Sequence, residues 1–305
     1  MPKKWVLKNN LKKGDQLSIN ELQNGRLEII PSLSEEKEDI REINIDTKEK
    51  SIEDLQRDII SAYINGYNII NIFGDISGKI AGIREMFHEL VALEIMEVTA
   101  KRVTAKVFSD VTGTSIDHLI RRINMITKTM IDETKALFET NRFFDDIVER
   151  DYEVNRQAFF GMRTLTIATL SPSVANKLNL SHFEIMYLRL LLEKLENIAD
   201  RVKSLAKIFA KTELLIGLKK ETRDELRSLL DMVGMNYDYV MKSLFKNDNK
   251  LTNAVFVTHT DNIKAAQAFL EKNKGVINLP LVVELLDRIS ALTENIARIV
   301  VDMKT

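Results

Sequence analysis

The hydrophobic positions of this chain follow a helical period over most of its length. After Gly113, apolar residues recur every three or four positions in six long segments, near 114–140, 141–170, 181–215, 219–246, 249–273 and 279–304. This spacing is typical of amphipathic helices. The breaks between the segments carry residues that end helices, such as Pro172, Gly217 and Gly275. Short connections between long helices predict antiparallel neighbours, and therefore helical bundles.

A different pattern precedes the bundles. Ser51 and Ser77 are placed to cap two helices, and the apolar run Tyr67–Phe73 has strand character. Val103–Val107 alternates between apolar and polar residues, as a strand does. We therefore expect a small α/β unit over residues 51–112.

The first residues form a block of their own. A short helix is expected to end before Gly14, and two alternating runs follow, Gln16–Glu21 and Arg26–Ile30. Asn24-Gly25 joins these runs and is the strongest short signal for a hairpin. The next stretch, residues 32–50, is rich in Glu and Lys and predicts a charged linker.

Composition restricts the chemistry that this chain can carry. The 44 Lys and Arg residues balance 45 Asp and Glu residues, so nucleic acid would have to be met by a local patch. There is no cysteine, which excludes disulfides, thiolate metal sites and cysteine nucleophiles. The four histidines lie far apart in the sequence, so a metal ion would have to be held by oxygen ligands. No run of roughly 20 apolar residues and no signal peptide is found, so we expect a cytoplasmic protein without membrane insertion.

An internal repeat is visible in the helical part. Glu196–Asp200 recurs as Glu294–Arg298, 98 residues later. Asp151–Asn155 lines up with Asp248–Thr252 at a spacing of 97 residues. Two matches at nearly the same spacing predict a duplication, and therefore two tandem three-helix bundles. We expect these bundles at residues 113–216 and 217–305.

The best candidates for chemistry are oxygen-bearing side chains that share a helix face. Glu196 and Asp200 stand four residues apart, as do Asp151 and Asn155. If the two helices are antiparallel neighbours, these side chains converge, and such hard oxygen ligands suit Mg, Ca or ferric iron. The alternative is that nearby cationic side chains pair with the carboxylates: Lys194, Arg201 and Lys203.

No catalytic constellation accompanies this cluster. Gly74–Lys79 lacks the spacing and the hydroxyl of a phosphate-binding loop. A carboxylate-bridged metalloenzyme on a helical bundle is the least favoured alternative, because the chain has no Glu-x-x-His pair. We therefore expect that the protein is not an enzyme.

Two helical segments resemble a known family. Ile147–Arg156, IVERDYEVNR, resembles the ERDxxVD segment of PhoU domains, and Leu195–Val202, LENIADRV, resembles their LERIADHAV segment. The resemblance implies a regulator of phosphate uptake that contacts a phosphate-transporter ATPase or a phosphate-linked signalling protein. It also implies a metal ion (iron, Mg or Ca) in the first repeat only, because Thr252 and Arg298 replace two ligands in the second. The metal ligands that it implies are Asp151, Asn155, Glu196 and Asp200.

The stretches before the bundles extend this resemblance. Leu55–Tyr67 and Leu90–Glu97 are similar to the region between the two modules of archaeal PhoU-related regulators. Pro2–Val6 followed by Leu11–Asp15 resembles the AbrB-like (SpoVT-like) swapped-hairpin domain that precedes it there. Such domains carry a further strand in front, whereas this sequence begins at Met1, so we expect a truncated form over residues 1–31.

The AbrB-like segment implies a homodimer and gives a second functional hypothesis. Its basic side chains make a modest patch for DNA phosphates, so the alternative function is a DNA-binding transcription regulator of phosphate genes. The lysines expected to contact DNA are Lys3, Lys4, Lys8, Lys12 and Lys13. The fold class expected is mainly α: two tandem PhoU-like three-helix bundles, preceded by a small α/β unit and a short AbrB-like hairpin.

Overall fold

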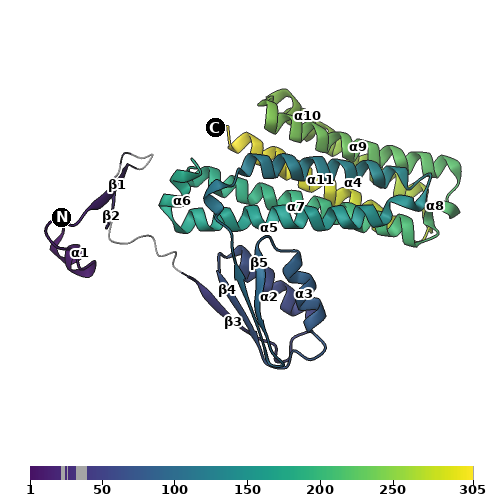
Figure 1. Ribbon diagram of the computed structural model, residues 1–305. Helices are drawn as coiled ribbons and strands as arrows, with labels where there is room; N and C mark the ends of the chain where they lie inside the picture. Colours follow the sequence, from purple (N-terminus) through teal and green to yellow (C-terminus); the bar gives the residue numbers. More distant parts are fainter. Residues whose placement is uncertain (22–24, 26, 32–39, 305) are drawn as a thin grey trace.

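The computed structural model describes residues 1–21, 25, 27–31 and 40–304. Three parts follow one another along the chain: a helix with a hairpin, an α/β unit, and a large helical body (Figure 1). None of the helices in these described ranges combines the length and the apolar character that crossing a bilayer requires.

The N-terminal part contains the expected short helix and hairpin. Helix α1 spans Lys3–Lys8, and strands β1 (Leu17–Glu21) and β2 (Leu27–Pro31) pair in antiparallel register. Gly25 has φ +73°, a left-handed conformation that suits glycine in a tight turn. Asn24, the other residue of the expected turn, lies outside the described residues.

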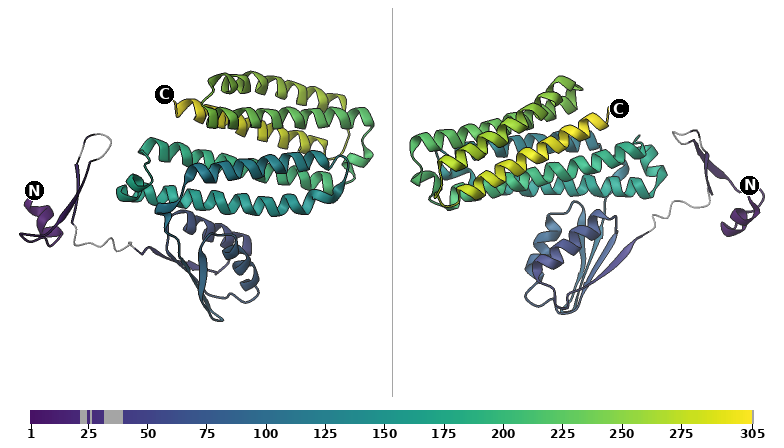
Figure 2. Two further views of the ribbon diagram at one scale, coloured as in Figure 1. Left: turned by 45° about the horizontal axis from the view of Figure 1, so that its top comes forward. Right: turned by 180° about the vertical axis from the view of Figure 1, so that it is seen from behind.

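The α/β unit is a four-stranded sheet with helices on one face (Figure 2). The strand order is β3-β4-β6-β5; β3 runs parallel to β4, and the other two pairs are antiparallel. Ile70 and Ile72 are fully buried in its core. The elements are β3 (Glu42–Asp46), α2 (Ile52–Ile64), β4 (Ile69–Phe73), α3 (Ile80–His88), β5 (Leu93–Val98) and β6 (Arg102–Val107).

The start of this unit corrects the expected linker over residues 32–50. Glu42–Asp46, inside that stretch, forms β3 at the edge of the sheet. Ile45 is buried while the acidic residues at both ends of the strand are exposed. Five residues of alternation inside a charged run are too short to be recognised as a strand without the neighbouring strand that they pair with.

The second helix of the unit also differs from the expectation. Ser77 does not cap it; α3 begins after Lys79, without a capping side chain. The helix ends at His88, and Ala92 adopts a left-handed φ of +58° before β5 begins. Strand β5 was not expected, because a bulge between Ile95 and Glu97 interrupts its alternation.

The helical body confirms the mainly α fold class. Helices α4, α5 and α7 pack on one another, as do α9, α10 and α11; α7 lies against α11 and α4 against α9 (Figures 1 and 2). Ser181 and Glu184 form a capping box at the start of α7. The long helices are α4 (Ile116–Ala136), α5 (Phe144–Leu170), α7 (His182–Lys211), α9 (Lys220–Lys246), α10 (Asn249–Lys272) and α11 (Leu279–Asp302). The short ones are α6 (Pro172–Lys177), α8 (Leu214–Gly217) and the 3-10 turns Val111–Gly113 and Asn141–Phe143.

Two arginines of α5 hold the α/β unit against the body. Arg163 is 2% exposed and donates from one guanidinium nitrogen to the carbonyl oxygens of Tyr63 and Tyr67, each at 2.7 Å. Arg156 donates to the carbonyl oxygen of His88 at 2.7 Å. The two arginines therefore contact the C-terminal ends of α2 and α3, where the negative end of each helix dipole lies.

Candidate functional site

Helices α5 and α7 are antiparallel neighbours that approach each other closely. A Cβ atom at Gly161 would lie 2.7 Å from Cδ1 of Leu192, so glycine is what permits this separation. One end of the contact brings Asp151 of α5 to Lys203 of α7. The structure thus brings together the helix faces that the sequence selects as oxygen-rich.

Asp151 is the most buried member of this carboxylate cluster. The residue is 0% exposed, and its Oδ2 accepts a hydrogen bond from Nζ of Lys203 at 2.5 Å. Its Oδ1 is buried and has no hydrogen-bond partner, and the same is true of Oδ1 of Asn155, one turn along α5. Burial raises the pKa of Asp151, and the hydrogen bond from Lys203 opposes that rise.

Asp200 uses both carboxylate oxygens. Oδ1 lies 3.0 Å from Nζ of Lys203, and Oδ2 lies 3.1 Å from a guanidinium nitrogen of Arg201. Burial alone would lower the pKa of Lys203, but its hydrogen bonds with Asp151 and Asp200 raise it. The lysine is therefore held as a cation between α5 and its own helix.

Glu196 completes the cluster on α7. Burial raises its pKa to about 7, with further increases from the negative charges of Asp200 and Asp151. Glu89, which follows α3, is affected by the same negative charges. Its pKa is raised first by burial, then by the charges of Glu85 and Asp151. The negative charge of the cluster therefore extends from the bundle to the α/β unit.

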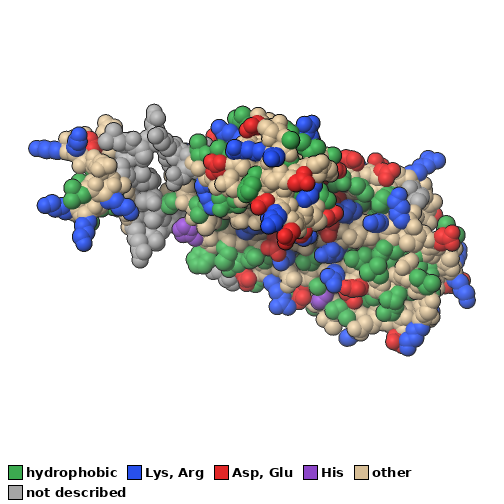
Figure 3. Space-filling view, turned by 90° about the horizontal axis from the view of Figure 1, so that it is seen from below, with side chains coloured by type: hydrophobic (Ala, Val, Ile, Leu, Met, Phe, Trp, Pro, Cys, Tyr) green, Lys and Arg blue, Asp and Glu red, His purple; other side chains and the backbone are tan. Residues whose placement is uncertain are grey.

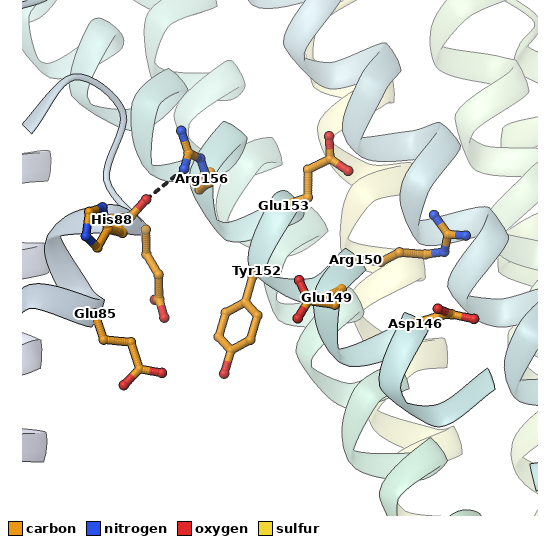
Figure 4. A pocket seen from close by; sticks show the side chains of 9 residues that line it. Glu85, His88, Asp146, Glu149, Arg150, Tyr152, Glu153 and Arg156 are labelled. Carbon is orange, nitrogen blue, oxygen red and sulfur yellow. Dashed lines mark hydrogen bonds between the residues drawn. The ribbon is translucent and has the colours of Figure 1, made fainter. Parts of the chain in front are cut away.

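An open groove of about 740 Å³ lies between α3 and α5. Figure 4 shows Glu85 and His88 on one side and side chains of α5 on the other. Arg156 is bonded to the carbonyl oxygen of His88, and Arg150 donates to both carboxylate oxygens of Glu133 at 2.9 and 2.8 Å. Both guanidinium groups are thus engaged. The lining residues are Glu85, His88, Glu89, Asp146, Glu149, Arg150, Tyr152, Glu153 and Arg156, so the groove is acidic.

The geometry of the cluster does not fit a metal ion. Within the described ranges, no three His, Asp or Glu side chains are arranged to hold one. Lys203 already lies at the centre, within bonding distance of Asp151 and Asp200, and an ammonium repels a metal cation. The expected site at Asp151, Asn155, Glu196 and Asp200 therefore stays a prediction, which the arrangement of charges disfavours. Of the three cations named as the alternative, Lys203 and Arg201 do pair with carboxylates of the cluster. The third, Lys194, pairs with Glu193 instead.

The second repeat places its residues differently. Asp248 caps the start of α10 and accepts a hydrogen bond from the backbone of Lys250, whereas Asp151 lies well inside α5. The proposed match of Asp151–Asn155 with Asp248–Thr252 therefore does not join equivalent positions. Thr252 is 1% exposed and its hydroxyl bonds to Ser243.

Glu294, the repeat counterpart of Glu196, has cationic and polar neighbours. Arg298 donates to its Oε1 at 2.9 Å, and Nε2 of His259 lies 3.5 Å from its Oε2. Nδ1 of His259 is 2.8 Å from the hydroxyl of Ser290, which is 3% exposed. The sequence does not predict this group around His259. It indicates Lys203 as a partner of the carboxylates, but not that Lys203 bridges α5 and α7.

The lysines expected to contact DNA lie on α1 and in the turn after it. All five side chains are exposed: Lys3, Lys4, Lys8, Lys12 and Lys13. Figure 3 shows Lys and Arg side chains projecting in several directions from this end of the molecule. The patch is therefore accessible, and its contact with DNA stays a prediction.

Comparisons with known proteins give one distant match. No family model and no curated protein matches the chain. Among solved structures, the crystal structure of PhoU from Pseudomonas aeruginosa is similar to it, at 14% sequence identity and a TM-score of 0.46. The match covers 62% of this chain and 95% of that one. The likeness is too distant to transfer a ligand, a partner or an activity.

Proposed function

We propose that this chain regulates phosphate uptake by docking onto a phosphate-transporter ATPase or a phosphate-linked signalling protein, and that it is not an enzyme. The observation that supports docking is the acidic groove between α3 and α5. The phosphate context comes from the PhoU-like segments Ile147–Arg156 and Leu195–Val202. Such a regulator would act in the cytoplasm, where the energy-coupling and signalling parts of uptake systems lie.

The chemistry of the groove favours a basic partner. Glu85 and Glu149 are exposed at its mouth, while the guanidinium groups of Arg150 and Arg156 are engaged by the protein itself. Tyr152, 37% exposed, lies among these charges and offers an aromatic face. A charged rim around an aromatic side chain is typical of a surface that steers and holds a charged partner.

Catalysis is less well supported. Ser290, His259 and Glu294 stand in a row like that of a serine hydrolase, but Ser290 is 3% exposed. A nucleophile must be reached by its substrate, and this hydroxyl is enclosed where α10 meets α11. Glu196 has the pKa of an acid or base near neutral pH, yet its neighbours are other carboxylates and Lys203.

The test compares affinity purification of tagged variants from phosphate-replete cells. The wild type should retain a transporter ATPase or a phosphate-linked kinase, identified by mass spectrometry. The double variant Glu85→Lys/Glu149→Lys should lose that protein, because it reverses the charge of the groove. The control Asp224→Lys/Asp261→Lys makes the same charge change at exposed sites of the second bundle and should retain it. Equal recovery with both variants would count against the groove.

DNA binding is a second candidate, supported by the five exposed lysines of the N-terminal part. Fluorescence anisotropy with duplex DNA should then show binding that weakens steeply with salt. Replacing Lys3, Lys4 and Lys8 with Glu should abolish it. Absence of binding by the full chain at low salt would remove this candidate. The homodimer stays a prediction, which sedimentation equilibrium would check.

A further inference from the structure

The carboxylate cluster of the first bundle already contains a cation, and that cation belongs to the chain. Nζ of Lys203 lies 2.5 Å from Oδ2 of Asp151 and 3.0 Å from Oδ1 of Asp200. It thereby joins the carboxylate of α5 to one on α7. Since Asp151 is fully buried, the ammonium is the group that neutralises it.

A lysine suits this position because its charge is compact. The ammonium is a point charge with three donors, and two of them are directed at Asp151 and Asp200. The remaining oxygen of Asp200 is occupied by Arg201. A metal ion placed among these oxygens would lie next to an ammonium within bonding distance of the same carboxylates, and the two cations would repel each other.

The unused oxygens show what the cluster would do without its lysine. Oδ1 of Asp151 and Oδ1 of Asn155 are both buried without a partner. Removing the ammonium would also release Oδ2 of Asp151 and Oδ1 of Asp200, and Glu196 lies within electrostatic reach of both. Carboxylate and amide oxygens are the ligands that hard cations such as Mg²⁺ and Mn²⁺ prefer, and water molecules complete their coordination.

We propose that Lys203 is the resident cation of this cluster: its ammonium occupies the place of a metal ion, and the oxygens around it form a metal site only when the ammonium is removed. The wild-type protein therefore does not bind a hard metal ion there.

The test titrates the full chain with Mn²⁺ and follows free Mn²⁺ by electron paramagnetic resonance. Lys203→Met removes the charge and keeps the length of the side chain. It should take up one Mn²⁺ at least about tenfold more tightly than the wild type. Lys207→Met changes an exposed lysine one turn further along α7 and should behave as the wild type. A folded Lys203→Met protein that gains no affinity would overturn the proposal.

Two further measurements separate this site from others and from misfolding. Adding Asp151→Asn to Lys203→Met should abolish the gained Mn²⁺, whereas persistence of binding would place the metal elsewhere and refute the site. The wild-type titration decides the matter even where Lys203→Met does not fold. Uptake of one Mn²⁺ by the wild type, lost in the single variant Asp151→Asn, would show that the ammonium does not take the place of the metal.

Discussion

The two bundles carry the same short string, Glu-Asn-Ile-Ala, in very different surroundings. In the first bundle, Glu196 is half-buried within electrostatic reach of Asp151 and Asp200, and Lys203 supplies the central positive charge. In the second, Glu294 is paired with Arg298 and faces His259. The string alone therefore does not determine the chemistry of its glutamate. The partners on the neighbouring helix and at the next turns do.

This difference predicts unequal costs when the cationic partner is lost. Lys203→Met should lower the free energy of unfolding by about 3 kcal/mol at pH 8, because it leaves the buried carboxylate of Asp151 without its counter-charge. Urea denaturation followed by circular dichroism measures the change. Lys207→Met is the matched control on the same helix. A loss below that of the control would mean that Lys203 does not stabilise the cluster.

The second largest effect should be the pH dependence of stability that Glu196 gives to the first bundle. The folded pKa of Glu196 is about 7, above its ordinary value of 4.5, so folded protein binds a proton that unfolded protein releases between these pH values. Stability from this group is therefore greatest at low pH and is lost as the pH rises towards 7. The pKa values of Asp151 and Glu89 are also raised, so these two groups change stability with pH in the same direction. The positive charges of Lys203 and Arg201 oppose the rise at Glu196.

Glu196→Gln isolates that effect. Between pH 5 and pH 8, the wild type should lose on the order of 2 kcal/mol of stability relative to the variant. Urea titrations at several pH values give the comparison. Parallel pH profiles for the two proteins would show that Glu196 ionises without a stability cost.

A smaller effect is expected at the second bundle. Ser290→Ala removes the buried hydroxyl that bonds to Nδ1 of His259, and should cost about 1 kcal/mol. Thermal and urea denaturation would measure it. Ser228→Ala, at an exposed position of α9, is the control and should cost less. Equal costs would mean that the contact between His259 and Ser290 contributes nothing specific.

The smallest effect should come from Arg298→Met. The side chain of Arg298 is 64% exposed, so its pair with Glu294 lies at the surface and should contribute less than about 0.5 kcal/mol. Raising the salt concentration should remove even that difference. A cost as large as that of Lys203→Met would erase the distinction between the bundles.

The sequence predicts the long helices well, because their apolar period extends over several turns and their caps are local. Ser181 and Glu184, for example, form a capping box at the start of α7. The sequence did not predict strands β3 and β5, because pairing with the neighbouring strands, rather than the pattern of their own few residues, defines them. The segment Glu42–Asp46 and the bulge beside Glu97 illustrate this.

The sequence predicts which carboxylates make up the candidate site, but not which positive group neutralises them. Four-residue spacing fixes Glu196 and Asp200 on one face, and antiparallel packing brings Asp151 to that face. Whether a metal ion or a lysine neutralises them depends on where Nζ of Lys203 ends up. That position depends on how α7 packs against α5, which spacing along the chain does not reveal.

Arg156 and Arg163 bind the α/β unit through its backbone, and this has an evolutionary consequence. Both donate to main-chain carbonyl groups, at His88, Tyr63 and Tyr67, and every amino acid supplies that acceptor. The exposed residue His88 can thus change without loss of the hydrogen bond to Arg156, whereas Tyr63 is also held by its burial and by the guanidinium of Arg163 over its ring. Sequence drift should accordingly accumulate faster at His88 than at Arg156.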